Sequence, residues 1–168
     1  AMISDTMAKA INGQIKEEIY SSYIYLAMAA HFEAENLPGF ANWMQLQARE
    51  ELVHAMKMFA HLSERGARVE LQAIDAPPST WESPLAAFEA AYEHEVYISG
   101  KINALVSQAL KENDHASIAF LQWFVTEQVE EEASADAVVQ KLKLVGKTAH
   151  GLFMIDRELA GRVASAPE

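Results

Sequence analysis

The sequence has no cysteine and few basic residues, and both shortages exclude classes of protein. Without cysteine, the chain can form no disulfide, thiolate zinc site or iron–sulfur centre, and it has no cysteine nucleophile. The 24 acidic residues outnumber the 13 lysines and arginines, giving a formal net charge of −11. This charge argues against nucleic acid as a partner, because phosphate binding requires basic side chains. It favours cations as partners, or simply high solubility.

Long hydrophobic runs are also missing. No stretch of about 18 consecutive apolar residues occurs, so we expect no membrane span. The N-terminus lacks a basic region followed by an apolar run, so we expect no secretory signal peptide. With 168 residues, of which 51% are hydrophobic, the sequence is long enough for a single domain over 1–168 with a sizeable core.

Proline and glycine are scarce and clustered, and the segments between the clusters have helical periodicity. Ser83 and Asp114 are placed to act as N-caps, and Gly66 is placed to act as a C-terminal cap. The sequence predicts an all-α fold with four long helices and a short fifth C-terminal helix. Their approximate ranges are 5–35, 38–65, 84–111, 114–145 and 149–163.

The lengths of the connections predict how these helices are arranged. Short turns join the first helix to the second and the third to the fourth, so each pair should form an antiparallel hairpin. The connection over 66–82 is long enough to span roughly 55 Å, and a helix of this size is roughly 42 Å long. We therefore expect a four-helix bundle with one long crossover. The sequence does not decide whether the fifth helix packs on its own bundle or at a symmetry axis.

Polar residues interrupt the apolar stripe of every long helix. Residues three, four and seven positions apart share one face of a helix. By that spacing, the stripes include Glu18, Glu51, His54, Glu95, Gln128 and Glu131. All of them lie near the middle of their helices, where depth hardly depends on chain direction. We expect them to meet at one level of the bundle.

Several carboxylates buried together are costly unless a cation neutralises them. Four glutamates and one imidazole form a hard, oxygen-rich ligand set that suits iron or manganese, with zinc as a competitor. Such a set can hold two divalent ions with little residual charge. The sequence therefore predicts a two-metal site in the middle of the bundle.

A second acidic group flanks the first. Glu50 precedes Glu51, while Glu127 and Glu130 are three positions apart, a spacing at which like charges repel. This group is either a solvated acidic face or a weaker third cation site outside the pair. Tyr25 lies two turns after Glu18 on the same face, where it is either a core residue or an oxidisable phenol beside the metals.

A set of ordered motifs between about residue 5 and residue 160 makes the chain resemble prokaryotic non-haem ferritins. The motifs are Glu17-Glu-Ile-Tyr-Ser-Ser22, Arg49-Glu-Glu-Leu-Val-His54, Tyr92-Glu-His-Glu95, Phe120-Leu-Gln-Trp-Phe-Val-Thr-Glu-Gln-Val-Glu-Glu-Glu132 and Gly151-Leu-Phe-Met-Ile-Asp-Arg-Glu-Leu159. The resemblance implies a ferritin-like bundle and a ferroxidase that oxidises Fe(II) with O2 or H2O2. It also implies a hollow homo-oligomeric shell of 24 subunits that stores ferric mineral in the cytoplasm.

The resemblance also implies a role for each candidate residue. Glu18, Glu51 and His54 would hold the first iron, with Gln128 close by. Glu51 would bridge to the second iron, which Glu95 and Glu131 would also hold. A third, outer iron would use Glu50, Glu127, Glu130 and Glu131, and Tyr25 matches the tyrosine near the pair. Haem is not expected, because Leu52 stands where bacterioferritins place a methionine ligand.

Two other functions are compatible with the same motifs. One is a di-iron oxygenase or radical-generating protein that acts on an organic substrate, although such proteins usually have two Glu-x-x-His motifs on core faces. The other is an interaction bundle whose acidic residues are coincidental. Iron loading and metal binding would separate these alternatives from a ferritin.

Overall fold

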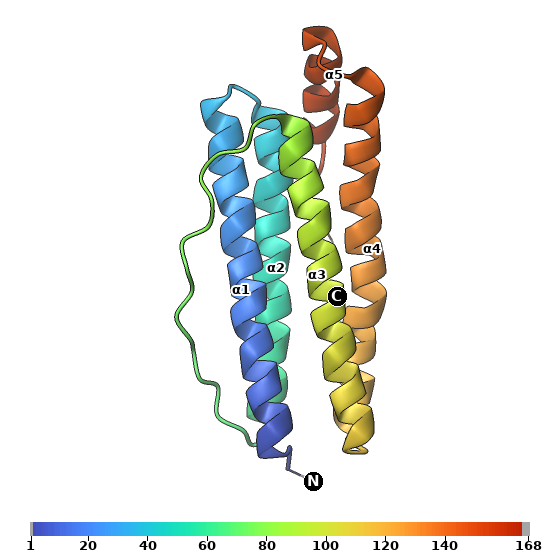
Figure 1. The fold of residues 1–168 in the computed structure, drawn as a ribbon. Helices are drawn as coiled ribbons and strands as arrows, with labels where there is room; N and C mark the ends of the chain where they lie inside the picture. Colours follow the sequence, from blue (N-terminus) through green and yellow to red (C-terminus); the bar gives the residue numbers. More distant parts are fainter. Residues whose placement is uncertain (1, 166–168) are drawn as a thin grey trace.

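The computed structural model describes residues 2–165 of this protein, and these residues contain five α-helices (Figure 1). Their bounds are α1 (Asp5–Ala34), α2 (Pro38–Glu64), α3 (Pro84–Lys111), α4 (His115–Val145) and α5 (Ala149–Ala160). Residues 2–165 contain no strand. Over the same residues, none of the helices combines the length and apolar character needed to cross a membrane.

The four long helices lie side by side in one bundle (Figure 1). Helix α1 is antiparallel to α2, and α3 is antiparallel to α4 (Figure 1). The loop between α2 and α3 runs the length of the bundle, so α3 begins at the end where α2 began (Figure 1). This arrangement confirms the prediction of a four-helix bundle with a long crossover and a short fifth helix.

Side-chain caps start α3 and α4. Ser83 Oγ accepts a hydrogen bond from the Ala86 amide at 3.0 Å, and Asp114 Oδ1 accepts one from the Ser117 amide at 3.1 Å. Each bond satisfies an amide that has no partner inside its own helix. Because Asp114 is the cap, α4 begins one residue later than the predicted range 114–145.

Left-handed residues follow the ends of α1, α2 and α3. They are Asn36 (φ 59°), Gly66 (φ 76°) and Asn113 (φ 54°), and this conformation turns the chain out of the helix. The residue before each of them is the C-cap and lies outside the helix. The predicted ranges 5–35 and 38–65 include this C-cap residue, so each is one residue too long.

A polar layer divides the hydrophobic core into two halves. One half is built around Phe32, Phe40 and Phe88, and the other around Met58 and Ile102. In each long helix the break between the halves falls at the carboxylates that interrupt the apolar stripe. The four acidic interruptions therefore lie at one depth, as the helix positions predicted.

Helix α5 packs on the chain's own bundle, mainly against α2. Leu37, at the start of α2, offers no capping side chain, but Asp156 Oδ1 accepts hydrogen bonds from the amides of Gly39 (2.8 Å) and Phe40 (3.0 Å). A Cβ at Gly39 would lie 1.6 Å from the Asp156 carbonyl oxygen, so only glycine permits this approach. These contacts decide the position of the fifth helix within the chain, which the sequence left open.

The fifth helix was predicted over 149–163 but ends at Ala160. On either side of that point, backbone carbonyls accept hydrogen bonds from a side chain of α2. Asn42 Nδ2 donates to the carbonyl oxygens of Leu159 and Arg162, at 3.1 Å each. Because the Asn42 side chain competes with backbone amides for these carbonyls, the chain leaves the helix here and continues along α2.

Candidate metal centre

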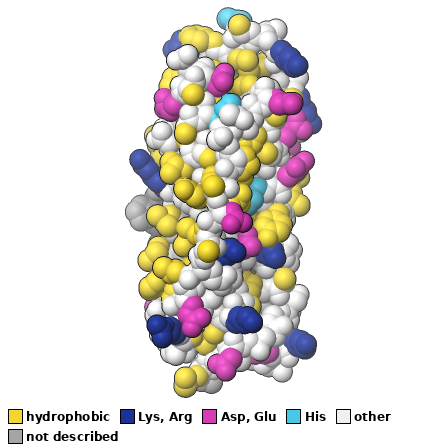
Figure 2. Space-filling view, turned by 60° about the vertical axis from the view of Figure 1, so that its left-hand side comes forward, with side chains coloured by type: hydrophobic (Ala, Val, Ile, Leu, Met, Phe, Trp, Pro, Cys, Tyr) yellow, Lys and Arg dark blue, Asp and Glu magenta, His cyan; other side chains and the backbone are white. Residues whose placement is uncertain are grey.

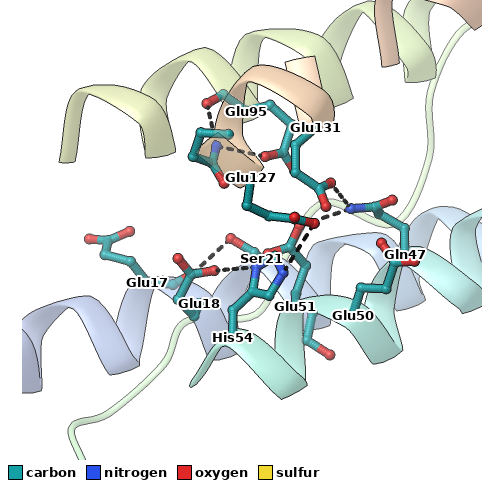
Figure 3. A network of polar contacts seen from close by, with 12 residues as sticks. Glu17, Glu18, Ser21, Gln47, Glu50, Glu51, His54, Glu95, Glu127 and Glu131 are labelled. Carbon is teal, nitrogen blue, oxygen red and sulfur yellow. Dashed lines mark hydrogen bonds and ion pairs between the residues drawn. The ribbon is translucent and has the colours of Figure 1, made fainter. Parts of the chain in front are cut away.

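All four long helices contribute side chains to a polar cluster at mid-height in the bundle (Figure 3). Glu51 and His54 share one face of α2 because three residues are close to one helical turn. The six predicted ligands of the two-metal site are all buried, with at most 5% of each residue exposed: Glu18, Glu51, His54, Glu95, Gln128 and Glu131. The structure therefore brings the whole predicted inner set together away from solvent.

Glu18, Glu51 and His54 form the first group of possible ligands, with one atom from each lying within 4.8 Å of the others. His54 Nδ1 is 3.2 Å from Glu51 Oε2 and 3.7 Å from Glu18 Oε2. None of these three buried atoms makes a well-aligned hydrogen bond with a described residue. Buried polar atoms almost always have a partner, so three that face one another are suited to a shared cation.

Glu51, Glu95 and Glu131 form a second group on the same 4.8 Å criterion, so Glu51 belongs to both groups. Gln47 Nε2 donates to Glu131 and, at 3.0 Å, to Glu51 Oε1. Gln128 Nε2 donates to Glu95 Oε2 at 3.1 Å. The predicted role of Gln128 was beside the first metal position, whereas the structure places its amide against Glu95 of the second group.

Burial sets the protonation of these groups. It raises the pKa of Glu51, Glu95 and Glu131 above the ordinary carboxyl range, and charges on neighbouring carboxylates raise each pKa further. Burial on its own lowers the pKa of His54, but Glu18 and Glu51 outweigh it and raise that pKa to about 11. A charged imidazole therefore offsets part of the negative charge of the carboxylates without metal, and a metal ion bound at Nδ1 must displace its proton.

Tyr25 lies directly beside the second group. Its hydroxyl donates to Glu95 Oε1 at 2.6 Å, and its ring is fully buried with an edge toward Trp43. Burial, followed by the charge of Glu95, raises the pKa of Tyr25 well above its usual value. The phenol therefore keeps its proton and acts as a hydrogen-bond donor to a candidate ligand.

The predicted outer site is only partly assembled. Glu127 Oε1 lies 3.9 Å from His54 Nε2, and Glu127 forms a third possible ligand group with His54 and Glu131. Glu50 and Glu130 belong to no such group within the described residues. They do line one pocket together with His54 and Glu127, so all of them border the same space.

Two neutral side chains that support the carboxylates were not among the predicted site residues. Gln14 Nε2 donates to Glu18 Oε1 at 3.2 Å, and Gln47 Nε2 donates to Glu51 Oε1. Each glutamine is four residues before its glutamate, a spacing at which helical side chains meet. The repeated Gln-x-x-x-Glu pattern was therefore a usable signal in the sequence.

Comparison with known proteins identifies the family of the chain. Residues 8–145 match the ferritin family, described as a ferritin-like domain. A bacterial non-heme ferritin of Bacteroides fragilis is 44% identical over 161 residues, which cover 96% of this chain and 100% of that protein. One from Campylobacter jejuni is 38% identical over 156 residues, covering 93% of each chain.

Solved structures give the same result. Crystal structures of an open-pore ferritin from the hyperthermophilic archaeon Archaeoglobus fulgidus include one with 55% sequence identity and a TM-score of 0.95 to this chain. The alignment covers 96% of this chain and 98% of the archaeal one. The motif resemblance is thus confirmed over nearly the whole sequence, and the chain belongs to the ferritin family.

Proposed function

We propose that this protein stores iron and oxidises Fe(II) to Fe(III) at a pair of metal positions inside the bundle. Membership of the ferritin family supports iron storage and ferroxidase activity in general. One observation carries the proposal of a metal site: Glu18 Oε2, Glu51 Oε2 and His54 Nδ1 are buried, face one another and lack hydrogen-bond partners among the described residues. A cation would satisfy all three atoms at once.

The two iron ions are substrates, and each has its own ligand group. Glu18, Glu51 and His54 bind the first ion, and Glu51, Glu95 and Glu131 bind the second. Glu51 bridges the two because it belongs to both groups. Mixed carboxylate and imidazole ligation suits Fe(II), and the shared carboxylate holds the ions close enough to give electrons to one oxidant.

The overall reaction removes one electron from each ion. With O2, two Fe(II) and two protons yield two Fe(III) and one H2O2. With H2O2, two Fe(II) and two protons yield two Fe(III) and two H2O. The buried carboxylates supply negative charge that favours the more highly charged Fe(III). The ferric product then leaves for a mineral core.

A third, weaker cation position lies outside the pair in this proposal. Glu127 stands against His54 and Glu131, and Glu50 and Glu130 border the same pocket. Because this pocket is open to solvent and the inner pair is not, the outer ion should exchange more readily. Its predicted ligands stay Glu50, Glu127, Glu130 and Glu131.

Exposed apolar side chains on α1 and α2 support self-association. Leu26, Leu52 and Met56 are each about half exposed, at 53%, 48% and 53%. Figure 2, which brings the left-hand side of Figure 1 forward, shows hydrophobic side chains spread over that face among scattered charged groups. Apolar patches of this kind mark protein interfaces. We propose a homo-oligomeric hollow shell, with 24 subunits and a cytoplasmic location as the expected form.

Iron oxidation and loading test this function directly. Glu51→Ala and His54→Ala should abolish rapid Fe(II) oxidation, whereas the exposed His150→Ala should oxidise at the wild-type rate. The wild-type particle should size at about 24 times the 18.6 kDa chain mass and take up far more than two irons per subunit. Wild-type rates in both ligand variants, or saturation at two irons with turnover of an organic substrate, would contradict the proposal.

A further inference from the structure

The segment after α5 folds back onto α2 beside the metal centre. Asn42 Nδ2 donates to the carbonyl oxygen of Leu159, in the last turn of α5, and to that of Arg162, in the segment after it. The Arg162 guanidinium donates to the Trp43 carbonyl oxygen at 3.0 Å and lies over the Trp43 ring, 4.4 Å from the ring centroid. Arg162 is therefore held in a defined position by a backbone bond and a ring contact.

Arg162 reaches the candidate ligands through one buried amide. Arg162 Nη2 donates to Gln47 Oε1 at 3.0 Å, and Gln47 Nε2 donates to both Glu51 and Glu131. A guanidinium has donors only, so it must face the oxygen end of the amide. The amide nitrogen is thereby directed at the two carboxylates. Gln47 is 1% exposed, so water has little access to compete for either end.

The same guanidinium pairs with Glu50 on the flank of the centre. Arg162 Nη2 is 3.3 Å from Glu50 Oε2, and each side chain is only about one-fifth exposed, at 20% and 22%. The other oxygen of Glu50 accepts a hydrogen bond from Ser165 Oγ at 2.8 Å. Both Glu50 oxygens are thus engaged by the segment after α5.

We propose that Arg162 is a positioning residue for the two-metal site and an internal competitor of the outer cation. Through Gln47 it fixes the orientation of Glu51 and Glu131. Through Glu50 it occupies a carboxylate that an outer ion would otherwise use, so the outer position binds more weakly than the inner pair. This inference rests on the proposed function, because it concerns ligands of the same centre.

Anaerobic titration of the assembled protein with Co(II) tests both roles. Co(II) binds nitrogen and oxygen ligands without being oxidised under these conditions, and its visible absorption reports coordination geometry. Wild type should show an inner class of ions and a weaker outer class. Arg162→Ala should raise the Co(II) affinity of the outer position about fivefold, as expected for the loss of one partly exposed ion pair. The same variant should also change the visible absorption of Co(II) bound at the inner positions, because Gln47 loses the hydrogen bond from Arg162.

Arg162→Lys separates charge from geometry. Lysine keeps the positive charge near Glu50, so the outer affinity should stay close to wild type. A single ammonium lacks the planar fork that holds the Trp43 carbonyl and Gln47 together, so the inner absorption should change as in Arg162→Ala. Arg157→Ala, which removes an exposed arginine from α5, is the matched control and should behave as wild type in both respects.

A double-mutant cycle assigns the effect to Glu50. In a Glu50→Gln background, adding Arg162→Ala should give no further gain in outer affinity. Unchanged outer affinity in Arg162→Ala, with sizing and circular dichroism confirming assembly, would overturn the competition. Unchanged inner absorption in both Arg162 variants would overturn the positioning role. No Co(II) binding by wild type would instead overturn the proposed function.

Discussion

His54 Nδ1 lies 3.2 Å from Glu51 Oε2, one helical turn earlier on α2, and neither atom has a hydrogen-bond partner among the described residues. His54 is 2% exposed and Glu51 is fully buried. Two charged groups held this way stabilise each other, but their hydrogen-bonding capacity stays unused. The centre is therefore arranged so that a cation gains contacts by replacing the imidazole proton.

Proton binding at His54 should make the stability of the metal-free protein fall as pH rises. The pKa of His54 is raised from 6.5 to about 11. The stabilisation that its proton gives the folded state is therefore complete below pH 6.5 and is lost as the pH rises from there to about 11. One proton corresponds to a slope of about 1.4 kcal/mol per pH unit. The raised carboxyl pKa values of Glu51, Glu95 and Glu131 act in the same direction above pH 4.5. Urea unfolding of chelator-treated protein across this range measures the slope.

The matched variant for this prediction is His54→Gln, which removes the titrating group but keeps a polar side chain. Its unfolding free energy should vary less with pH between 6.5 and 9 than that of wild type. Equal slopes in the two proteins would show that His54 does not hold the proton.

Removing the bridging ligand and removing a terminal ligand should have different effects on metal binding. Glu51 belongs to both ligand groups and Glu95 to only one. In anaerobic calorimetry with Fe(II), Glu51→Ala should lose both inner ions, whereas Glu95→Ala should keep about one per subunit. Identical stoichiometry in the two variants would contradict the bridging role of Glu51.

Neutralising one buried carboxylate should stabilise the metal-free protein and weaken metal binding. Glu131 is 5% exposed, and the charges of Glu51 and Glu95 raise its pKa in addition to burial. Glu131→Gln keeps an oxygen that can accept the Gln47 bond but removes a repelled charge, so the metal-free form should gain about 1 kcal/mol near pH 8. Thermal unfolding with and without Co(II) checks this, and a less stable metal-free variant would refute it.

Loss of the Tyr25 hydroxyl should destabilise the second ligand group. That hydroxyl is buried and donates to Glu95 Oε1 at 2.6 Å. Tyr25→Phe leaves a buried carboxylate oxygen with one partner fewer, which costs about 1–2 kcal/mol. Tyr23→Phe is the control because Tyr23 is 48% exposed. Equal unfolding free energies for the two variants would show that the Tyr25 bond contributes nothing.

Asp156 should anchor α5 to the start of α2. Asp156→Ala removes the acceptor for two amides at a helix N-terminus and should cost about 1–2 kcal/mol. Asp156→Asn keeps a neutral acceptor and should lose less. Hydrogen exchange should rise across α5 in Asp156→Ala and across the first turn of α2. Unchanged exchange in both segments would contradict the capping role.

The helices and their polar interruptions were predictable because they depend on residues close together in the chain. Glu51 and His54 share a face through backbone geometry alone, whatever the other helices do. The ends of the helices were less predictable by a residue or more, because caps such as Asp114 decide them. The hydrogen bonds from Gln14 and Gln47 to the carboxylates were not predicted, although each glutamine lies four residues before the glutamate that it supports.

An all-helical bundle with carboxylates at one depth was predictable from the residues alone, because helical periodicity and loop length constrain both. The position of α5 and the contacts of the segment after it depend instead on the packed fold. Asp156 binds amides 116 and 117 positions away, and Arg162 binds Gln47 across 115 positions. Contacts at such separations leave no periodic trace in a sequence. They depend on how packed helices bring distant side chains together, and that packing joins the C-terminal segment to the candidate metal centre.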